Sequence, residues 1–138
     1  MSKHPALHVH RIDHVTIVVG DLDATEDFYC RCLGMQRVER PAFSFDGRWF
    51  QAGATQIHAT ISHPEAGEAG WGDRGVKQAS RGHHFAFQVD DARAAAALAQ
   101  ELGIEIADGP KLRPDGFVQL YVYDPDRHVV ELFSNPEA

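Results

Sequence analysis

The sequence is poor in cysteine, with only Cys30 and Cys32 among its 138 residues. Helix positions two apart do not face each other, so we expect free thiols, which suit a reducing compartment. No apolar run approaches the roughly 20 residues that a membrane-spanning helix needs. The first residues also lack the apolar core of a signal peptide. These absences argue against a membrane protein and make the cytoplasm the expected location.

Basic residues are also scarce. The chain has 13 lysines and arginines against 20 aspartates and glutamates, which gives a net charge of −7. This balance argues against nucleic acid as a partner, because surfaces that bind nucleic acid carry clustered positive charge. A chain of this length suffices for one compact domain but not for two ordinary ones. Any internal division must therefore give small modules that share an interface.

The pattern that the chain does contain is duplicated. Residues 14–23 read HVTIVVGDLD, and residues 84–93 read HFAFQVDDAR. Each copy begins with a histidine at the head of a predicted strand and continues into a helical run that ends in Leu-Gly. Each half closes on an apolar strand with one further potential metal ligand, His58 in the first half and Glu131 in the second. The repeat suggests four groups that converge on one point.

The element order predicted from the pattern is βαβββ, twice. β-branched and alternating segments predict strands, and an aspartate before and a glycine after each helical run mark the helix ends. The predicted strands are 12–19, 35–40, 56–62, 84–89, 104–107, 117–123 and 129–133, and residues 45–50 are predicted to form a turn that enters a further strand. The predicted helices are 23–33 and 92–101. We expect Pro110 and Pro114 to shape a loop. The predicted organisation is a flexible N-terminus (1–10), a first module (11–62), a loop or linker (63–81) and a second module (82–135).

Several short motifs match a known family in the same order along the chain. They are DHVTIVV at 13–19, LGM at 33–35, GHHFAF at 82–87 and DPDRHVVEL at 124–132. With these motifs the chain resembles the vicinal oxygen chelate superfamily, which includes glyoxalase I, fosfomycin and bleomycin resistance proteins and extradiol dioxygenases. The resemblance implies an α+β fold in which two tandem βαβββ modules form an open, curled, mixed-sheet cleft (the glyoxalase-like fold). It also implies a homodimer.

The same resemblance implies a divalent metal held by the first and last strands of each module. His14, His84 and Glu131 match three of the ligand positions, and His58 matches the fourth, where relatives often carry Glu or Gln. Imidazole and carboxylate ligands suit Fe²⁺, Zn²⁺, Ni²⁺, Mn²⁺ or Co²⁺. If His58 is not a ligand, it is expected to act as a general base near the metal. Glu131 is a second candidate for moving a proton.

The expected substrate-binding residues lie around these ligands. Phe117, Gln119 and Tyr121 share one face of a strand, since side chains alternate along strands. Gln88 shares the face of His84, and Arg48 precedes aromatic residues that would line the mouth of the cleft. Trp71, within the linker, would either anchor that loop or cover a bound ligand.

Three functions fit these residues. The first is a metal-dependent, glyoxalase-like lyase or isomerase that acts on a small oxygenated substrate chelated through vicinal oxygens. The second is an extradiol-type ring-cleaving dioxygenase, and the third is a metal-free small-molecule binding or resistance protein of the same fold. The unrepeated parts of the chain, 43–50 and 63–82, are expected to decide what binds.

Overall fold

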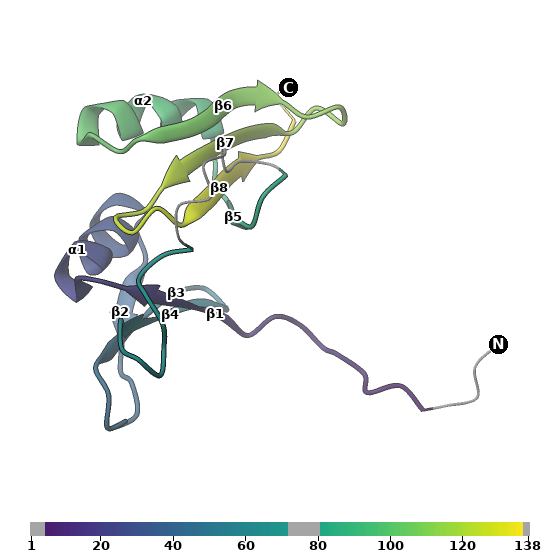
Figure 1. The fold of residues 1–138 in the computed structure, drawn as a ribbon. Helices are drawn as coiled ribbons and strands as arrows, with labels where there is room; N and C mark the ends of the chain where they lie inside the picture. The colour runs from purple at the N-terminus through teal and green to yellow at the C-terminus, as the bar shows by residue number, and fades with distance from the viewer. Residues whose placement is uncertain (1–4, 72–80, 137–138) are drawn as a thin grey trace.

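The computed structural model describes residues 5–71 and 81–136, and its elements follow the predicted order (Figure 1). The first module contains β1 (His14–Val19), α1 (Leu22–Glu26), the π-helical turn η1 (Asp27–Cys32), β2 (Gln36–Val38), β3 (Gly47–Ala52) and β4 (Thr55–Ile61). The second contains β5 (Phe85–Gln88), α2 (Ala92–Leu102), β6 (Ile106–Leu112), β7 (Val118–Tyr123) and β8 (Val129–Ser134). Part of the expected linker, 72–80, lies outside the described residues.

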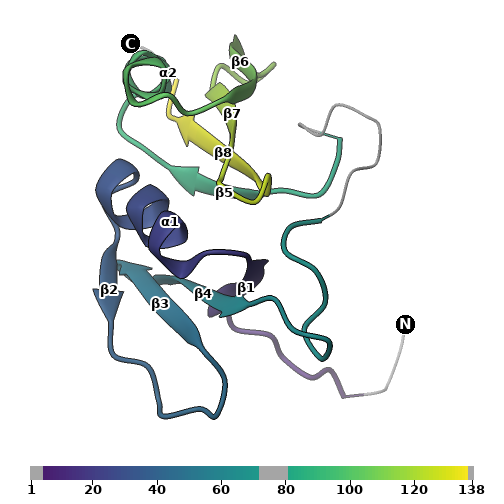
Figure 2. The ribbon, with the colours of Figure 1, turned by 60° about the vertical axis from the view of Figure 1, so that its left-hand side comes forward.

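Each module forms its own four-stranded mixed sheet. The strand orders are β1-β4-β3-β2 and β5-β8-β7-β6, so the two sheets have the same topology. In each sheet the first and last strands of the module pair in parallel, and the other pairs are antiparallel. Figure 2 shows the two sheets as separate units, one module above the other, with α1 between them. The predicted duplication and fold class are confirmed.

The helices begin and end as the sequence predicts, but one of them differs in its second half. Asp21 and Asp91 accept backbone N–H groups at the starts of α1 and α2, and Gly103 ends α2 with a left-handed φ of 74°. The predicted helix at 23–33 is α-helical only to Glu26 and continues as a π-helical turn. The wider turn buries two consecutive residues, Phe28 and Tyr29, which a regular helix would place about 100° apart.

The third strand of the second module is longer than predicted. The sequence predicts a strand at 104–107 and a loop at Pro110, whereas β6 runs to Leu112. β6 is an edge strand, and an edge strand tolerates proline because one side of its backbone makes no ladder bonds. The register with β7 shifts on both sides of Asp108. The local irregularity therefore replaces the expected loop.

A buried carboxylate joins the two modules. The Tyr29 hydroxyl of η1 donates to Oδ2 of Asp124, 2.7 Å away, and His128 Nδ1 lies 2.7 Å from the same oxygen. The other oxygen of Asp124 accepts the backbone N–H groups of Asp126 and His128. Burial, and then the Asp124 charge, raise the pKa of Tyr29 well above its usual value, so its hydroxyl stays a donor. One continuous apolar core also includes residues of both modules.

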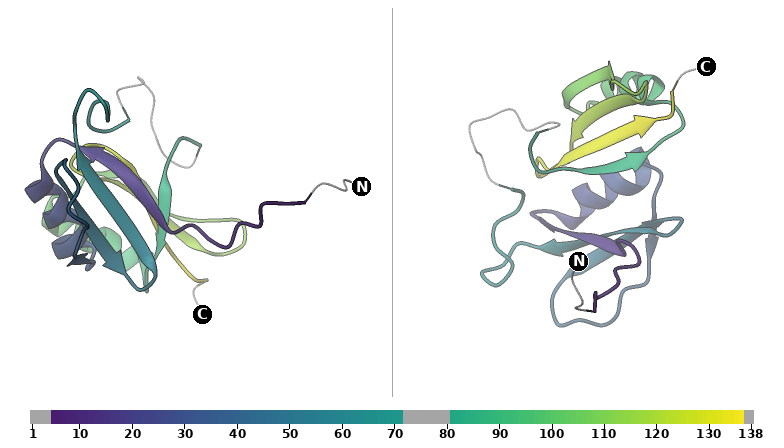
Figure 3. Two further views of the ribbon diagram at one scale, coloured as in Figure 1. Left: turned by 90° about the horizontal axis from the view of Figure 1, so that it is seen from below. Right: turned by 90° about the vertical axis from the view of Figure 1, so that its right-hand side faces the viewer.

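The segment before β1 stands apart from this core. Residues 5–13 carry no regular secondary structure and are exposed, and the left view of Figure 3 shows this arm extending away from the two packed modules. Leu7 and Val9 on the arm are 99% and 90% exposed. Among the described residues, none of the helices has the length and apolar character needed to cross a membrane.

Replacing Tyr29 with phenylalanine should destabilise the joined modules. Asp124 would keep its other partners but lose a charged hydrogen bond in a buried place, so we expect the free energy of unfolding to fall by about 1–3 kcal/mol. Urea denaturation measures this difference. The matched control is Tyr123→Phe, which keeps the ring under Arg127 and should change stability by less than about 0.5 kcal/mol. Equal stabilities for the two variants would contradict the role given to Asp124.

Candidate metal centre

The potential ligands occupy the same place in both sheets. In the first module, Thr16 pairs with His58, and Thr16 lies two residues after His14. In the second module, Ala86 pairs with Glu131, and Ala86 lies two residues after His84. Residues two apart on a strand face the same side, so each module presents one histidine and one further ligand on one face. We call His14 with His58 the first-module pair, and His84 with Glu131 the second-module pair.

The second-module pair is arranged like two ligands of one cation. His84 Nδ1 lies 3.0 Å from the carbonyl oxygen of Gly82, which can only accept, so Nδ1 carries a proton and Nε2 is the nitrogen left to act as a ligand. That Nε2 lies 3.2 Å from Oε1 of Glu131. Glu131 is only 5% exposed, and a buried carboxylate is costly unless a positive charge compensates it. The donor set therefore fits a divalent metal.

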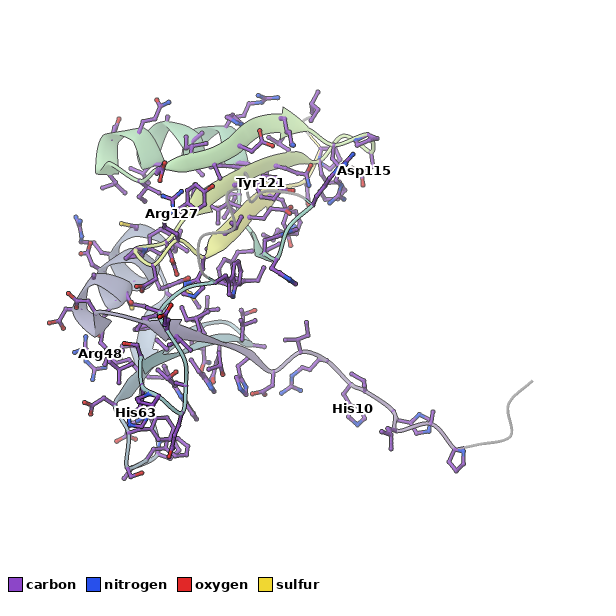
Figure 4. All side chains as sticks on the ribbon, viewed as in Figure 1. His10, Arg48, His63, Asp115, Tyr121 and Arg127 are labelled. Carbon is purple, nitrogen blue, oxygen red and sulfur yellow. The ribbon has the colours of Figure 1, made fainter. Side chains whose placement is uncertain are left out.

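Two of the predicted substrate-binding residues surround Glu131. Gln119 Nε2 donates to the Tyr121 hydroxyl oxygen at 3.0 Å and reaches Oε2 of Glu131 at 3.4 Å. Burial, and then a hydrogen bond to Glu131, raise the pKa of Tyr121 to about 12. Tyr121 thus stays protonated beside the carboxylate, in the second module where Figure 4 labels it. The structure brings these two residues together with the second-module pair.

The first-module pair lies in a stack of rings. The His58 ring lies between the His14 ring, at a centroid distance of 3.9 Å, and the Trp49 indole, at 3.8 Å. His14 Nδ1 lies 3.0 Å from Oδ2 of Asp13, an arrangement common among metal-bound histidines because it orients the ring and leaves Nε2 free. His14 therefore also fits a ligand role.

His58 has a different environment. Its Nε2 lies 2.7 Å from Oε1 of Gln56, and the Gln56 amide donates in turn to Gln51. Because Gln56 uses its amide nitrogen for Gln51, its oxygen accepts from His58, and Nδ1 of His58 carries the lone pair. Burial, and then the charge of His14, lower the pKa of His58. This environment favours a neutral imidazole with one accepting nitrogen.

The structure does not bring the two pairs together. Over residues 5–71 and 81–136, no group of three or more His, Cys, Asp or Glu side chains is placed to hold a metal. Each pair supplies two donors, whereas catalytic zinc sites have three protein ligands. The two pairs thus lie at equivalent places in the two sheets of the chain, with two donors each.

Other predicted substrate-binding residues lie farther from the pairs. Arg48 bonds with Asp23 and Glu26 of α1 and faces the helix side of its sheet, beside α1 in Figure 4, so it does not line the cleft face. Gln88 bonds with Asn135, and Phe117 packs on Phe133.

Trp71 is half-buried in the second module. Its indole packs edge-on against Phe85 and His128, so it anchors the loop that precedes 72–80. Of the two roles considered for Trp71, the structure supports the anchor.

A cavity of about 670 Å³ lies next to the first-module pair. It opens on the same sheet face, because it is lined by Thr16 and Thr60, two residues from His14 and His58 on the strands β1 and β4. Val18 and Ile61 of the same strands also line it. The rest of its lining comes from loops, including Phe45, Asp46, His63 and Glu65. These loops belong to the unrepeated parts that were expected to shape the binding site.

Comparison with known proteins identifies the family. Residues 11–132 match the Glyoxalase/Bleomycin resistance protein/Dioxygenase superfamily. The chain belongs to this superfamily. The glyoxalase domain-containing protein RDO1 of Mycosarcoma maydis is 30% identical over 96% of this chain and 72% of its own length. A probable lactoylglutathione lyase of Vibrio cholerae is 26% identical over 94% of each chain.

A solved structure of another superfamily protein has the same fold. The putative glyoxalase family protein from Bacillus anthracis superimposes with a TM-score of 0.71 at 25% identity, over 95% of this chain and 99% of its own. The superfamily fold thus extends over almost the whole chain.

The surroundings of His58 lead to a prediction for this superfamily member without metal. The pKa of His58 should lie below its ordinary value of about 6.5, because burial and a positive His14 both disfavour the imidazolium. Histidine ring NMR signals followed against pH measure it. The variant His14→Gln should raise the pKa of His58, whereas His10→Gln, on the exposed arm labelled in Figure 4, should leave it unchanged. A His58 pKa at or above about 6.5 would contradict this account.

Proposed function

We propose that the protein is a metal-dependent lyase or isomerase of the glyoxalase type, which acts on a small molecule chelated to the metal through vicinal oxygens. The second-module pair carries the proposal: a buried Glu131 carboxylate beside the free nitrogen of an oriented His84. The Vibrio cholerae relative, a probable lactoylglutathione lyase, supports the choice of reaction class.

We propose further that two copies of the chain complete the site. His14 and His58 of one copy would face His84 and Glu131 of a second copy. A two-fold symmetric dimer repeats every contact, so it would contain two identical sites. The edge strands β1 and β5 lie beside the last strands that carry His58 and Glu131, which places both pairs near a sheet edge where a second copy can approach.

The residues around the proposed metal have distinct parts in the reaction. The metal would act as a Lewis acid that stabilises an oxyanion on the chelated substrate. His58 is the proposed general base: Gln56 holds its Nε2 proton, and its lowered pKa keeps Nδ1 free to accept a proton at neutral pH. Tyr121, protonated because its pKa is about 12, orients Glu131. Gln119 holds the Tyr121 oxygen in place.

Metal content and turnover test the proposed reaction. The protein loaded with Ni²⁺ or Zn²⁺ should isomerise the hemithioacetal of glutathione and methylglyoxal. Glu131→Gln should lower kcat/KM by at least about 100-fold, because loss of a residue that only orients a metal ligand already costs about 10–100-fold, and Glu131 is itself a proposed ligand. His10→Ala is the matched histidine control, with no change expected. Oxygen uptake with a catechol and Fe²⁺ would instead favour the dioxygenase. A protein that binds no metal would favour the metal-free binding protein.

Mixing two inactive variants tests the shared site. His14→Ala and Glu131→Ala should each bind no metal as homodimers. In a mixed dimer, one site would have lost both residues and the other would be intact, so a randomly mixed sample should regain about one quarter of the wild-type metal content. Equilibrium dialysis followed by elemental analysis measures this. No recovery in dimers that have been shown to exchange subunits would place each site within one chain.

A further inference from the structure

Arg40 lies in the loop between β2 and β3, and its Nε–H is buried. Among the residues that the structure describes, this Nε–H has no hydrogen-bond acceptor and the guanidinium has no carboxylate partner. Buried donors are nearly always paired, so each exception requires an explanation. Other arginines of the first module are paired with carboxylates: Arg31 with Asp27, Arg37 with Glu26, and Arg48 with Asp23 and Glu26.

The guanidinium is also held in one place. Its Cζ lies 4.7 Å from the centre of the Phe43 ring and 4.9 Å from that of Phe45, within the range of cation–π attraction. A Cβ on Gly47 would lie 3.0 Å from both Cζ and Nε of Arg40, so the absent side chain of this glycine makes the space that the group fills. An arginine fixed by its neighbours is ready to bind, because little side-chain entropy is left to lose.

Arg40 lies on the sheet face that carries the first-module pair. Gly47 pairs with Thr60, and Trp49 pairs with His58, so Gly47, Trp49 and His58 share one face because side chains alternate. Arg40 covers Gly47 on that face. Phe43 contacts Trp49, whose ring stacks on His58, and Phe45 lines the adjacent cavity. The positive charge of Arg40 also acts on His58, as one contribution to its lowered pKa.

We propose that Arg40 is the oxyanion-binding residue on the sheet face that carries His14 and His58, and that it holds a carboxylate, phosphonate or phosphate group of the bound ligand. A guanidinium can donate two parallel hydrogen bonds to such a group, which would supply the missing acceptor. The claim that this ligand is also the metal-chelated substrate rests on the proposed function, but the oxyanion site itself does not. The cavity itself is lined by Asp46 and Glu65 as well as Phe45, and negative charges repel an anion. We therefore expect the anion beside the Arg40 guanidinium, where Phe43 and Phe45 pack.

Binding of simple anions to the metal-free protein tests the site apart from the reaction. Methylphosphonate and acetate are titrated into protein labelled with ¹⁵N-arginine, and the Nε–Hε signal of Arg40 is followed. A saturable shift is expected, and the anion that binds more tightly identifies the class of oxyanion. Arg40→Gln should weaken binding at least about tenfold, the equivalent of about 1.4 kcal/mol for one charged hydrogen bond. Arg40→Lys keeps the positive charge but cannot donate two parallel hydrogen bonds, so its affinity for the anion should lie between those of the wild type and Arg40→Gln.

The controls separate this proposal from its competitors. Arg37→Gln removes a neighbouring arginine that is already paired with Glu26 and should leave anion binding unchanged. Amide spectra of each variant verify the fold. The proposal is overturned if no saturable shift occurs, if Arg40→Gln binds as well as the wild type, or if Asp46→Asn shifts the Arg40 signal as the loss of an internal ion pair would. If the protein binds anions but neither binds a metal nor turns over the substrate, only the proposed function is contradicted.

Discussion

The parallel pairing of the first and last strands of each module is the constraint on which the site depends. Parallel neighbours need a long crossover connection, and in both modules the crossover consists of a helix and two strands. The register of these pairs is held by their buried face, which includes Ile17, Val19, Ile57 and Ala59 in the first module. A slip of one residue would turn this face to solvent. The same register therefore keeps His58 next to His14.

Secondary-structure elements that are determined by neighbouring residues could be predicted from the sequence. The aspartate caps, the glycine stop at Gly103 and the alternating strands all follow from nearby residues, and the duplicated pattern gave the topology. The π-helical turn and the long β6 could not be predicted in this way. The burial of Tyr29 depends on Asp124, 95 residues away, which accepts a hydrogen bond from its hydroxyl. Pro110 is tolerated because β6 has a neighbour on only one side. Both reasons lie in tertiary structure.

The same division applies to the candidate site. Strand parity placed Gln119 and Tyr121 on one face of a strand, and in the structure the two side chains lie beside each other, with Gln119 reaching Glu131. The prediction that Arg48 lies near the mouth of the cleft was wrong, because the turn before β3 leaves the register of this strand uncertain in the sequence. The pairing of Trp49 with His58 turns Arg48 toward α1. No sequence pattern marked Arg40, whose significance comes from the empty position at Gly47 and from the absence of a partner among the described residues.

The way in which the modules are joined bears on how a complete metal site can form. Bringing His14 to His84 within one chain would require the modules to move relative to each other. That movement would break the buried bond between Tyr29 and Asp124 and the bond from Gly20 N–H to Asp126, and a buried group left without its partner costs about 1–3 kcal/mol. It would also open an apolar core that both modules share.

Association of two copies breaks none of these contacts. It would also bring a metal to Glu131, whose buried carboxylate lies beside His84, Gln119 and Tyr121. The bonds that hold one chain together thus favour a second copy as the source of the remaining ligands.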